Sequence, residues 1–178
     1  MKFQPLDIVG AYLISPDLHV DNRGYFGRTF CEKEYSRLGL ETKFVQSNVS
    51  FNKSMGTLRG LHFQKAPYEE VKLVSCTAGS VFDVLIDLRV DSDSFLKNIS
   101  VILNSEDHCI LYVPKGVAHG FLTMQEESVV SYQMSEFYQP NAAAGLRWND
   151  AVVNVIWPGN KKDYIISERD SGFLDFLI

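Results

Sequence analysis

The chain has 178 residues, of which 46% are hydrophobic and 22% are charged, a composition typical of a globular protein with a sizeable core. Its 17 basic and 22 acidic side chains give a formal net charge of −5, which argues against non-specific binding to nucleic acid or to an anionic membrane. Pro5 and Asp7 interrupt the apolar start, and no window is long enough to span a membrane. We therefore expect a single domain over 1–178 in a cytoplasmic protein.

Short runs of β-branched and aromatic residues, separated by turn residues, dominate the chain. A helix is expected first, over 31–40, with Gly39 at its end. The expected strands are 43–52, 57–64, 71–79, 80–90, 97–104, 108–114, 127–138 and 151–158. Ala78–Ser80 and Asn104–Asp107 predict hairpin turns, and 167–177 predicts a short helical turn. Many strands with little helix indicate an all-β fold, an antiparallel sandwich or barrel of the jelly-roll kind.

Residues 57–64, TLRGLHFQ, place an arginine and a histidine in a run that otherwise resembles a buried strand. In a regular strand Arg59 and His62 would face opposite sides, because side chains alternate. A glycine within a strand often marks a bulge, and a bulge at Gly60 would bring both side chains to one face. Polar side chains face inward at low cost only where they are paired or line a wet cavity. We therefore expect a barrel whose interior is partly polar.

Other polar residues also lie within apolar strands or beside turns. Lys72 lies in EEVKLVSC, His119 in VPKGVAHGF and Tyr132 in VVSYQMS. Arg23 precedes a glycine and two aromatic residues in DNRGYF, and Asp170 lies in SERDSG. Taken singly, each also fits a structural role, such as surface display for Lys72, core packing for Tyr132 or capping of a helical turn by Asp170. Their combination is more specific than any one of them.

Metal-dependent and serine-hydrolase chemistry are poorly supported by the side chains available. The four histidines are His19, His62, His108 and His119, and the three cysteines are Cys31, Cys76 and Cys109. The histidines contain no H-x-H pair, and the cysteines have no spacing typical of a metal site or a disulfide framework. No G-x-S-x-G motif is present. We expect no metal and interpret the cysteines as reduced thiols.

Proton transfer fits the polar residues better. A histidine accepts a proton near neutral pH, and a nearby carboxylate would fix its tautomer. A tyrosine can return a proton from another side, and a lysine can stabilise an oxyanion. The residues that supply these groups are His62, Asp170, Tyr132 and Lys72, with Arg23 and Arg59 available to clamp a diphosphate. This set suits abstraction of a proton beside a carbonyl, through an enolate.

Along nearly its whole length, the chain resembles the RmlC family, the dTDP-4-dehydrorhamnose 3,5-epimerases. The motifs that carry the resemblance are DNRGYF, QSNVS, GTLRGLHFQ, KLVSCTAGSVFDVLIDLR, VPKGVAHGF, SYQMSEFYQP, GLRWND and ISERD. The resemblance implies a cupin-like jelly roll and a homodimer that exchanges N-terminal elements. It also implies epimerisation of a nucleotide-linked 4-keto-6-deoxy sugar without metal or cofactor.

The resemblance also implies roles for individual residues. His62 would be the base, oriented by Asp170, Tyr132 would be the acid on the opposite face of the sugar, and Lys72 would hold the C4 oxyanion. The positions that match contacts to the diphosphate, the sugar or the nucleoside are Arg23, Arg59, Gln46, Asn48 and His119. Tyr138 matches an aromatic that stacks on the base, and Phe26 another wall of that pocket, lent by a partner subunit. Arg28 and Glu168 complete the expected substrate-binding set.

Two positions depart from the family pattern, because Arg28 and Ala143 stand where the family commonly has glutamates. A carboxylate accepts the N3–H of thymine, whereas an arginine suits the N3 acceptor of cytosine. The departures leave two alternatives open, a CDP-linked substrate or neutral drift at the rim of the pocket.

Other readings of the sequence differ in reaction or in class. The four catalytic residues do not decide whether C3, C5 or both are inverted. A 3,4-ketoisomerase is disfavoured because Lys72, Tyr132 and Asp170 match the epimerase motifs. A sugar-nucleotide-binding protein without catalysis has no need of base, orienting carboxylate, acid and cation together. A purely structural β-domain would have its polar strand residues in solvent and would not be stabilised by a nucleotide sugar.

Overall fold

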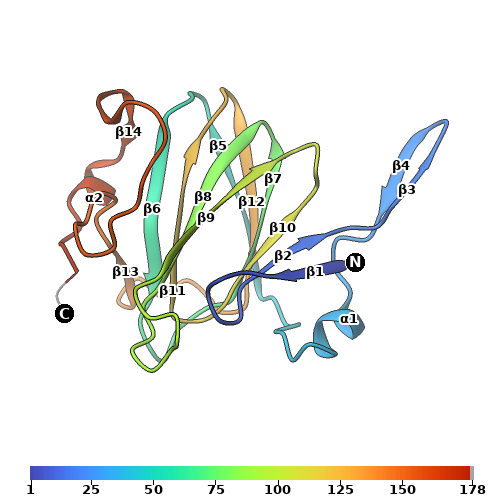
Figure 1. Ribbon diagram of the computed structural model, residues 1–178, viewed down its shortest axis with the longest axis horizontal. Helices are drawn as coiled ribbons and strands as arrows, with labels where there is room; N and C mark the ends of the chain where they lie inside the picture. Colours follow the sequence, from blue (N-terminus) through green and yellow to red (C-terminus); the bar gives the residue numbers. More distant parts are fainter. Residues whose placement is uncertain (177–178) are drawn as a thin grey trace.

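The structure, a computed structural model, describes residues 1–176 and consists mainly of two β-sheets packed face to face (Figure 1). The first sheet contains, in spatial order, β1 (Lys2–Pro5), β2 (Tyr12–Ser15), β10 (Ile110–Val113), β7 (Lys72–Ala78), β12 (Ser128–Met134) and β5 (Gln46–Asn52). The second contains β13 (Ala143–Gly145), β6 (Thr57–Gln64), β11 (Val117–Thr123), β8 (Ser80–Asp87) and β9 (Asn98–Asn104), and β14 (Ile165–Ile166) pairs with β6 in parallel. This arrangement confirms the expected all-β jelly roll.

A two-stranded ribbon projects away from the two sheets, as Figure 1 shows. It consists of β3 (Leu18–Asp21) and β4 (Gly24–Gly27), which pair only with each other. Large apolar side chains on this ribbon are exposed, among them Val20 at 77% and Phe26 at 74%. The ribbon therefore presents apolar surface that this chain alone does not bury.

Three apolar clusters hold the sheets in place. One lies between the sheets and includes Val74 and Leu85. A second covers the outer face of the second sheet and includes Leu61 and Trp157, so this sheet is buried on both faces. Burial on both faces is why β8, with the sequence SVFDVLID, is apolar almost throughout instead of alternating. The third packs the first sheet against α1 (Glu32–Ser36) through Tyr35.

The two turns predicted to close hairpins join different sheets instead. Ala78–Ser80 connects β7 to β8, and Asn104–Asp107 leads from β9 toward β10, so each turn carries the chain across the barrel. The turns themselves are present, since Gly79 has a φ of 73° and the Asn104 Oδ1 atom accepts the amides of Glu106 and Asp107 at 2.9 and 2.8 Å. The hairpin prediction was wrong because turn residues specify a bend and not the strand that pairs next.

The segment 151–158 was predicted to be a strand and is an irregular segment lying on the second sheet. Val153, Val155 and Trp157 are buried, while Val152 and Ile156 are exposed at 42% and 83%. The alternation that suggested a strand therefore arises from an extended segment packed on a sheet face without belonging to the sheet. In contrast, β11 is a central strand that the sequence analysis did not anticipate.

Both expected helical segments are confirmed, although they are short. α1 covers part of the expected 31–40 range, and Gly39, with a φ of 68°, follows it and donates its amide to Ser36. α2 (Glu168–Ser171) lies within 167–177, of which residue 177 is outside the described residues. A 3₁₀ turn occupies Lys161–Asp163. Within 1–176, no helix has the length and apolarity needed to cross a membrane.

Candidate active site

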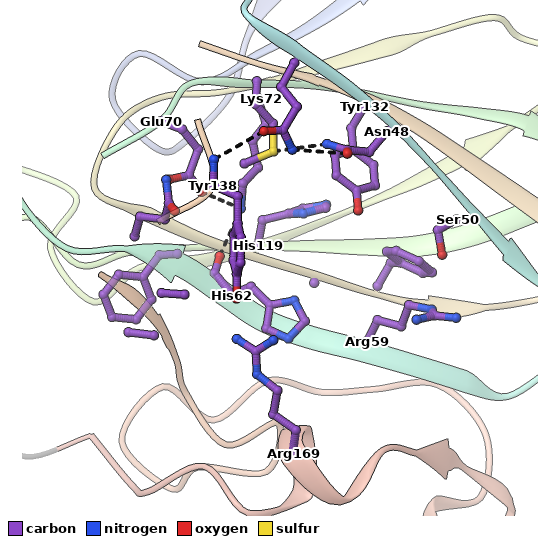
Figure 2. Close-up of a pocket in the computed structure, with 18 residues that line it drawn as sticks. Asn48, Ser50, Arg59, His62, Glu70, Lys72, His119, Tyr132, Tyr138 and Arg169 are labelled. Atoms are coloured by element: carbon purple, nitrogen blue, oxygen red, sulfur yellow. Dashed lines mark hydrogen bonds and ion pairs between the residues drawn. The ribbon is translucent and has the colours of Figure 1, made fainter. Parts of the chain in front are cut away.

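The interior of the barrel contains a cavity of about 430 Å³, whose lining comes from both sheets (Figure 2). Most residues singled out from the sequence converge here: Gln46, Asn48, Arg59, His62, Lys72, His119, Tyr132 and Tyr138. Ala143 of β13 also lines this space. The cavity is therefore the place where the chain gathers its titratable side chains.

A β-bulge in β6 turns two side chains toward the cavity. His119 pairs with His62 and Phe121 pairs with Arg59, so three steps along β6 match two steps along β11. Gly60 lies within the bulge with a φ of 122°, and a Cβ atom there would lie 2.6 Å from the Gly120 Cα atom. Only glycine fits so close to the neighbouring strand. The predicted bulge at Gly60 is confirmed, and it places Arg59 and His62 on one face.

His62 forms a pair with Asp170, which α2 brings to the edge of the cavity. The His62 Nε2 atom lies 2.8 Å from one carboxylate oxygen, and the amide of Gly60 donates to the other at 3.0 Å. Ser167 caps α2 by accepting the amide of Asp170 at 3.1 Å, so Ser167 and not Asp170 is the capping residue.

The carboxyl group of Asp170 stays ionised although it is only 5% exposed. Burial is the largest single effect and raises its pKa, but hydrogen bonding and charge from His62, the amide of Gly60 and the charge of Arg169 together outweigh it. The pKa of Asp170 therefore lies below its ordinary value. An ionised partner fixes the His62 tautomer and stabilises the ring when it gains a proton.

Lys72 is buried, which rules out simple display on the surface. Its Nζ atom lies 3.0 Å from the Glu70 Oε1 atom and donates to the main-chain oxygen of His62 at 3.1 Å. The side chains of Lys72 and Glu70 are 7% and 4% exposed. An ammonium group has three donors, so two of those of Lys72 are used within the protein and one remains for a ligand.

Tyr132 reaches into the cavity from β12, with its hydroxyl toward the open space (Figure 2). Burial raises the pKa of this phenol, and the nearby charge of Arg59 offsets only part of the effect. The hydroxyl is therefore protonated at neutral pH and available as a donor. Arg59 is itself held by a hydrogen bond of 2.7 Å to Asn52.

A second histidine–aspartate pair lies deeper in the barrel. The His119 Nε2 atom lies 3.0 Å from an oxygen of Asp83, which is fully buried. Burial raises the pKa of Asp83 more than the charges of His119 and Lys72 lower it. This carboxyl group therefore resists ionisation, unlike Asp170.

Polar side chains of β5 form one wall of the cavity. The Gln46 side chain donates to Asn48 at 3.1 Å and accepts the main-chain amide of Tyr138 at 3.2 Å. Asn48 in turn donates to the sulfur of Met134. These bonds order the wall next to Tyr138, whose ring is 48% exposed at the mouth of the cavity.

Four expected substrate-binding residues do not line the cavity of this chain. Arg23 and Phe26 lie on the projecting ribbon, where Arg23 pairs with Asp21 at 2.6 Å. Arg28 lies just beyond the ribbon and pairs with Glu34 at 3.3 Å, and Glu168 is exposed on α2. Within one chain, none of the four reaches the cavity, because the ribbon and the outer face of α2 point elsewhere. The expectation that a partner subunit lends Phe26 stays a prediction.

Three charged residues in or next to the cavity were not predicted from the sequence. Glu70 precedes Lys72 by two residues, a spacing that places both on one side of an extended chain. Asp83 is an acid in the middle of a largely apolar strand, which is a sign of a buried partner. Figure 2 shows Arg169 reaching from α2 toward His62, and only the three-dimensional fold could place it there.

The described residues contain no ready-made metal site. Over 1–176, no three or more His, Cys, Asp or Glu side chains are grouped so that they could hold an ion. The three cysteines are free, and Cys76 is buried.

Comparisons with known proteins agree with this geometry. The family described as dTDP-4-dehydrorhamnose 3,5-epimerase matches residues 5–176. A protein of that name from Sinorhizobium fredii is 41% identical over 171 residues, which cover 96% of this chain and 87% of the relative.

Two solved structures that carry the same name have the same fold. The one from Elizabethkingia anophelis is 39% identical with a TM-score of 0.96, and the match covers 99% of this chain and 96% of the other. The one from Bacillus anthracis, with TDP and PPi bound, is 37% identical with a TM-score of 0.94, covering 98% and 99%. The chain therefore belongs to the dTDP-4-dehydrorhamnose 3,5-epimerase family, a group of isomerases that act on nucleotide sugars.

Proposed function

We propose that this protein epimerises a nucleotide-linked 4-keto-6-deoxyhexose, dTDP-4-dehydro-6-deoxyglucose, at C3 and C5 in deoxysugar biosynthesis. One observation carries the proposal: the His62–Asp170 pair, Lys72 and Tyr132 meet around a single cavity. Membership of the family supports the same reaction. A protein that only binds the sugar would not need all four groups together.

Each half-reaction is a pair of proton transfers. The His62 Nδ1 atom, left free by the bond between Nε2 and Asp170, removes the proton from a carbon beside the C4 ketone. The electron pair of the broken C–H bond forms the enolate. The enolate oxygen accepts a hydrogen bond from the remaining N–H of Lys72. Tyr132 then donates its phenolic proton to the opposite face of the same carbon, and solvent restores that proton while His62 releases its own. Every step is a proton transfer, so the proposed reaction consumes no cofactor.

The rest of the lining would hold the substrate. Arg59 supplies a cation for the diphosphate, and His119, Gln46 and Asn48 supply hydrogen bonds to the sugar or nucleoside. Tyr138 offers an exposed ring at the mouth for stacking on the base. Contacts from Arg23 and Phe26 would come from a partner's ribbon in a cytoplasmic homodimer, since the ribbon projects from its own barrel (Figure 1).

A CDP-linked substrate, with inversion at C5 only, is the second candidate. Ala143 lines the cavity and offers no carboxylate to a thymine N3–H. Arg28 pairs with Glu34 outside the cavity of this chain, so within one chain it is not placed to contact a base bound in the cavity. The relative from Bacillus anthracis holds TDP and favours the thymidine nucleotide.

Deuterium incorporation tests the proposal. The protein is incubated in D₂O with dTDP-4-keto-6-deoxyglucose, and C3 and C5 are examined by NMR. Label at both carbons supports 3,5-epimerisation, and label at one identifies a single-site epimerase. No label from this substrate but label from its CDP analogue would select the second candidate. If neither substrate is labelled although the protein binds them, the result would support a sugar-nucleotide-binding protein without catalysis.

A further inference from the structure

Glu70 takes no part in the proposed proton transfers, yet it is one of the most completely buried charged residues of the cavity. Its side chain is 4% exposed, and one oxygen, Oε1, lies 3.0 Å from the Lys72 Nζ atom. The other oxygen, Oε2, is buried and makes no hydrogen bond to any residue in 1–176. A carboxylate in that position is unfavourable unless its charge is used by a neighbour.

The contacts of the Lys72 ammonium group show how Glu70 acts on this neighbour. The ammonium group donates to Glu70 on one side and to the main-chain oxygen of His62 on another. The three N–H bonds of an ammonium group are tetrahedrally arranged, so fixing two of them fixes the direction of the third. The position of the residual donor is therefore set by Glu70 and by the strand that carries His62.

Charge adds to this geometric effect. The titratable groups around Lys72 come from several elements: Glu70 before β7 contacts it directly, Asp83 on β8 interacts with it through charge, and His62 on β6, His119 on β11 and Tyr132 on β12 line the same cavity. Asp83 resists ionisation, and Tyr132 is neutral at pH 7. Glu70 is thus the carboxylate in direct contact that favours the charged form of the buried lysine.

We propose that Glu70 is a positioning residue that keeps the Lys72 ammonium charged and aims its free N–H at the carbonyl oxygen of the substrate. This inference rests on the proposed function for the identity of that oxygen. The ion pair with Lys72 does not depend on it.

The test uses Glu70→Gln, which keeps an accepting oxygen and removes the charge, and Glu70→Ala, which removes both. Glu69→Gln is the matched control, because Glu69 is the adjacent acid and lies outside the cavity lining. Thermal unfolding verifies that each variant is folded. The first readout is the titration of Lys72. It is monitored by NMR in protein that carries lysine labelled with ¹³C at Cε. The Lys72 signal is assigned by its absence from Lys72→Arg.

We expect the Lys72 signal to lose the chemical shift of the charged form at lower pH in Glu70→Gln than in wild type, and to stay unchanged in Glu69→Gln. In the deuterium assay, Glu70→Gln should lower kcat about tenfold, with KM nearly constant, and move the alkaline limb of the pH profile to lower pH. Glu70→Ala should lower kcat further, because the direction of the donor is lost as well.

An unchanged Lys72 titration in Glu70→Gln would overturn the inference, whatever the wild-type activity. Equal activity of Glu70→Gln and Glu69→Gln would do the same. Wild-type protein that exchanges no deuterium, while Lys72 titrates as expected, would instead overturn the proposed function and leave the ion pair standing as the device that keeps Lys72 charged.

Discussion

The two histidine–aspartate pairs of the cavity contain the same side chains in different surroundings. His62 and His119 lie opposite each other on β6 and β11, and both use Nε2 to contact their carboxylate. The side chain of His62 is 38% exposed, whereas that of His119 is 9% exposed. Asp170 gains additional donors and a lowered pKa, but Asp83 is fully buried and has a raised pKa. The comparison shows that supporting contacts, not residue identity, decide which of the two carboxyl groups ionises readily.

Replacing the two histidines one at a time should give the largest contrast. His62→Asn removes the proposed base and should lower the rate of deuterium exchange by about 10²–10⁴-fold. His119→Asn should act mainly through KM, with at most about a tenfold loss of kcat, because its ring is buried and its partner Asp83 resists ionisation. The measurement is kcat and KM for each variant. Equal losses of kcat would remove the distinction between the two pairs.

Gly60 connects the two pairs, so substitution there should disturb both. Its amide donates to Asp170, and a Cβ atom would lie 2.9 Å from the main-chain oxygen of His119. Gly60→Ala should lower the free energy of unfolding by about 2–4 kcal/mol, from backbone strain and crowding between β6 and β11. Denaturant unfolding measures this change. Gly159→Ala is the control, since Gly159 also has a positive φ but has open space around it; an equal loss there would assign the effect to strain alone.

The two aspartates should give opposite pH dependence of stability. Because the folded pKa of Asp170 is lowered, its stabilising contribution is present above the ordinary value of 3.8 and is lost as pH falls through the lowered pKa. Because the folded pKa of Asp83 is raised, its contribution is present below 3.8 and is lost as pH rises through the raised pKa.

Asn variants measured against wild type by thermal unfolding therefore separate the two sites. The Tm deficit of Asp170→Asn should grow from acid to neutral pH, and that of Asp83→Asn should shrink over the same range. Parallel trends in the two variants would contradict the assignment of opposite electrostatic surroundings.

The smallest effect should come from the cap that holds Asp170. Ser167→Ala removes the oxygen that accepts the Asp170 amide and should lower the free energy of unfolding by about 1 kcal/mol. Activity should fall slightly with it, because α2 then positions the carboxylate less firmly. Ser171→Ala, at the other end of α2, serves as the control and should change neither quantity measurably. A Ser167 variant that matches this control would show that Gly60 and His62 alone orient Asp170.

Local signals in the sequence predicted many elements well. The strand at 57–64 has the expected bounds, and Gly39 follows the expected helix. The bulge at Gly60 could be predicted because an arginine and a histidine on one apolar strand need a shared polar space. These features depend on neighbouring residues, which the sequence displays directly.

Features that depend on distant parts of the chain were missed or mistaken. The turn at 78–80 has ordinary turn residues, and nothing local distinguishes a hairpin from a crossing between sheets. The alternation at 151–158 reflects packing on a sheet formed by other residues. Glu70 and Asp83 are ordinary acids until the fold buries them, and Arg28 and Phe26 could be placed near a cavity only by resemblance.

The parallel pairing of β14 with β6 brings a carboxylate from late in the chain to a histidine 108 residues earlier. Apart from the short edge strand β13, the strands whose side chains line the cavity all precede residue 135, so on the ribosome they emerge well before Asp170 does. A nascent chain can thus close its barrel with His62 still lacking its carboxylate. The arrival of the last segment would then complete the His62–Asp170 pair, so that a growing chain gains the ability to bind a ligand before it gains the ability to transform one.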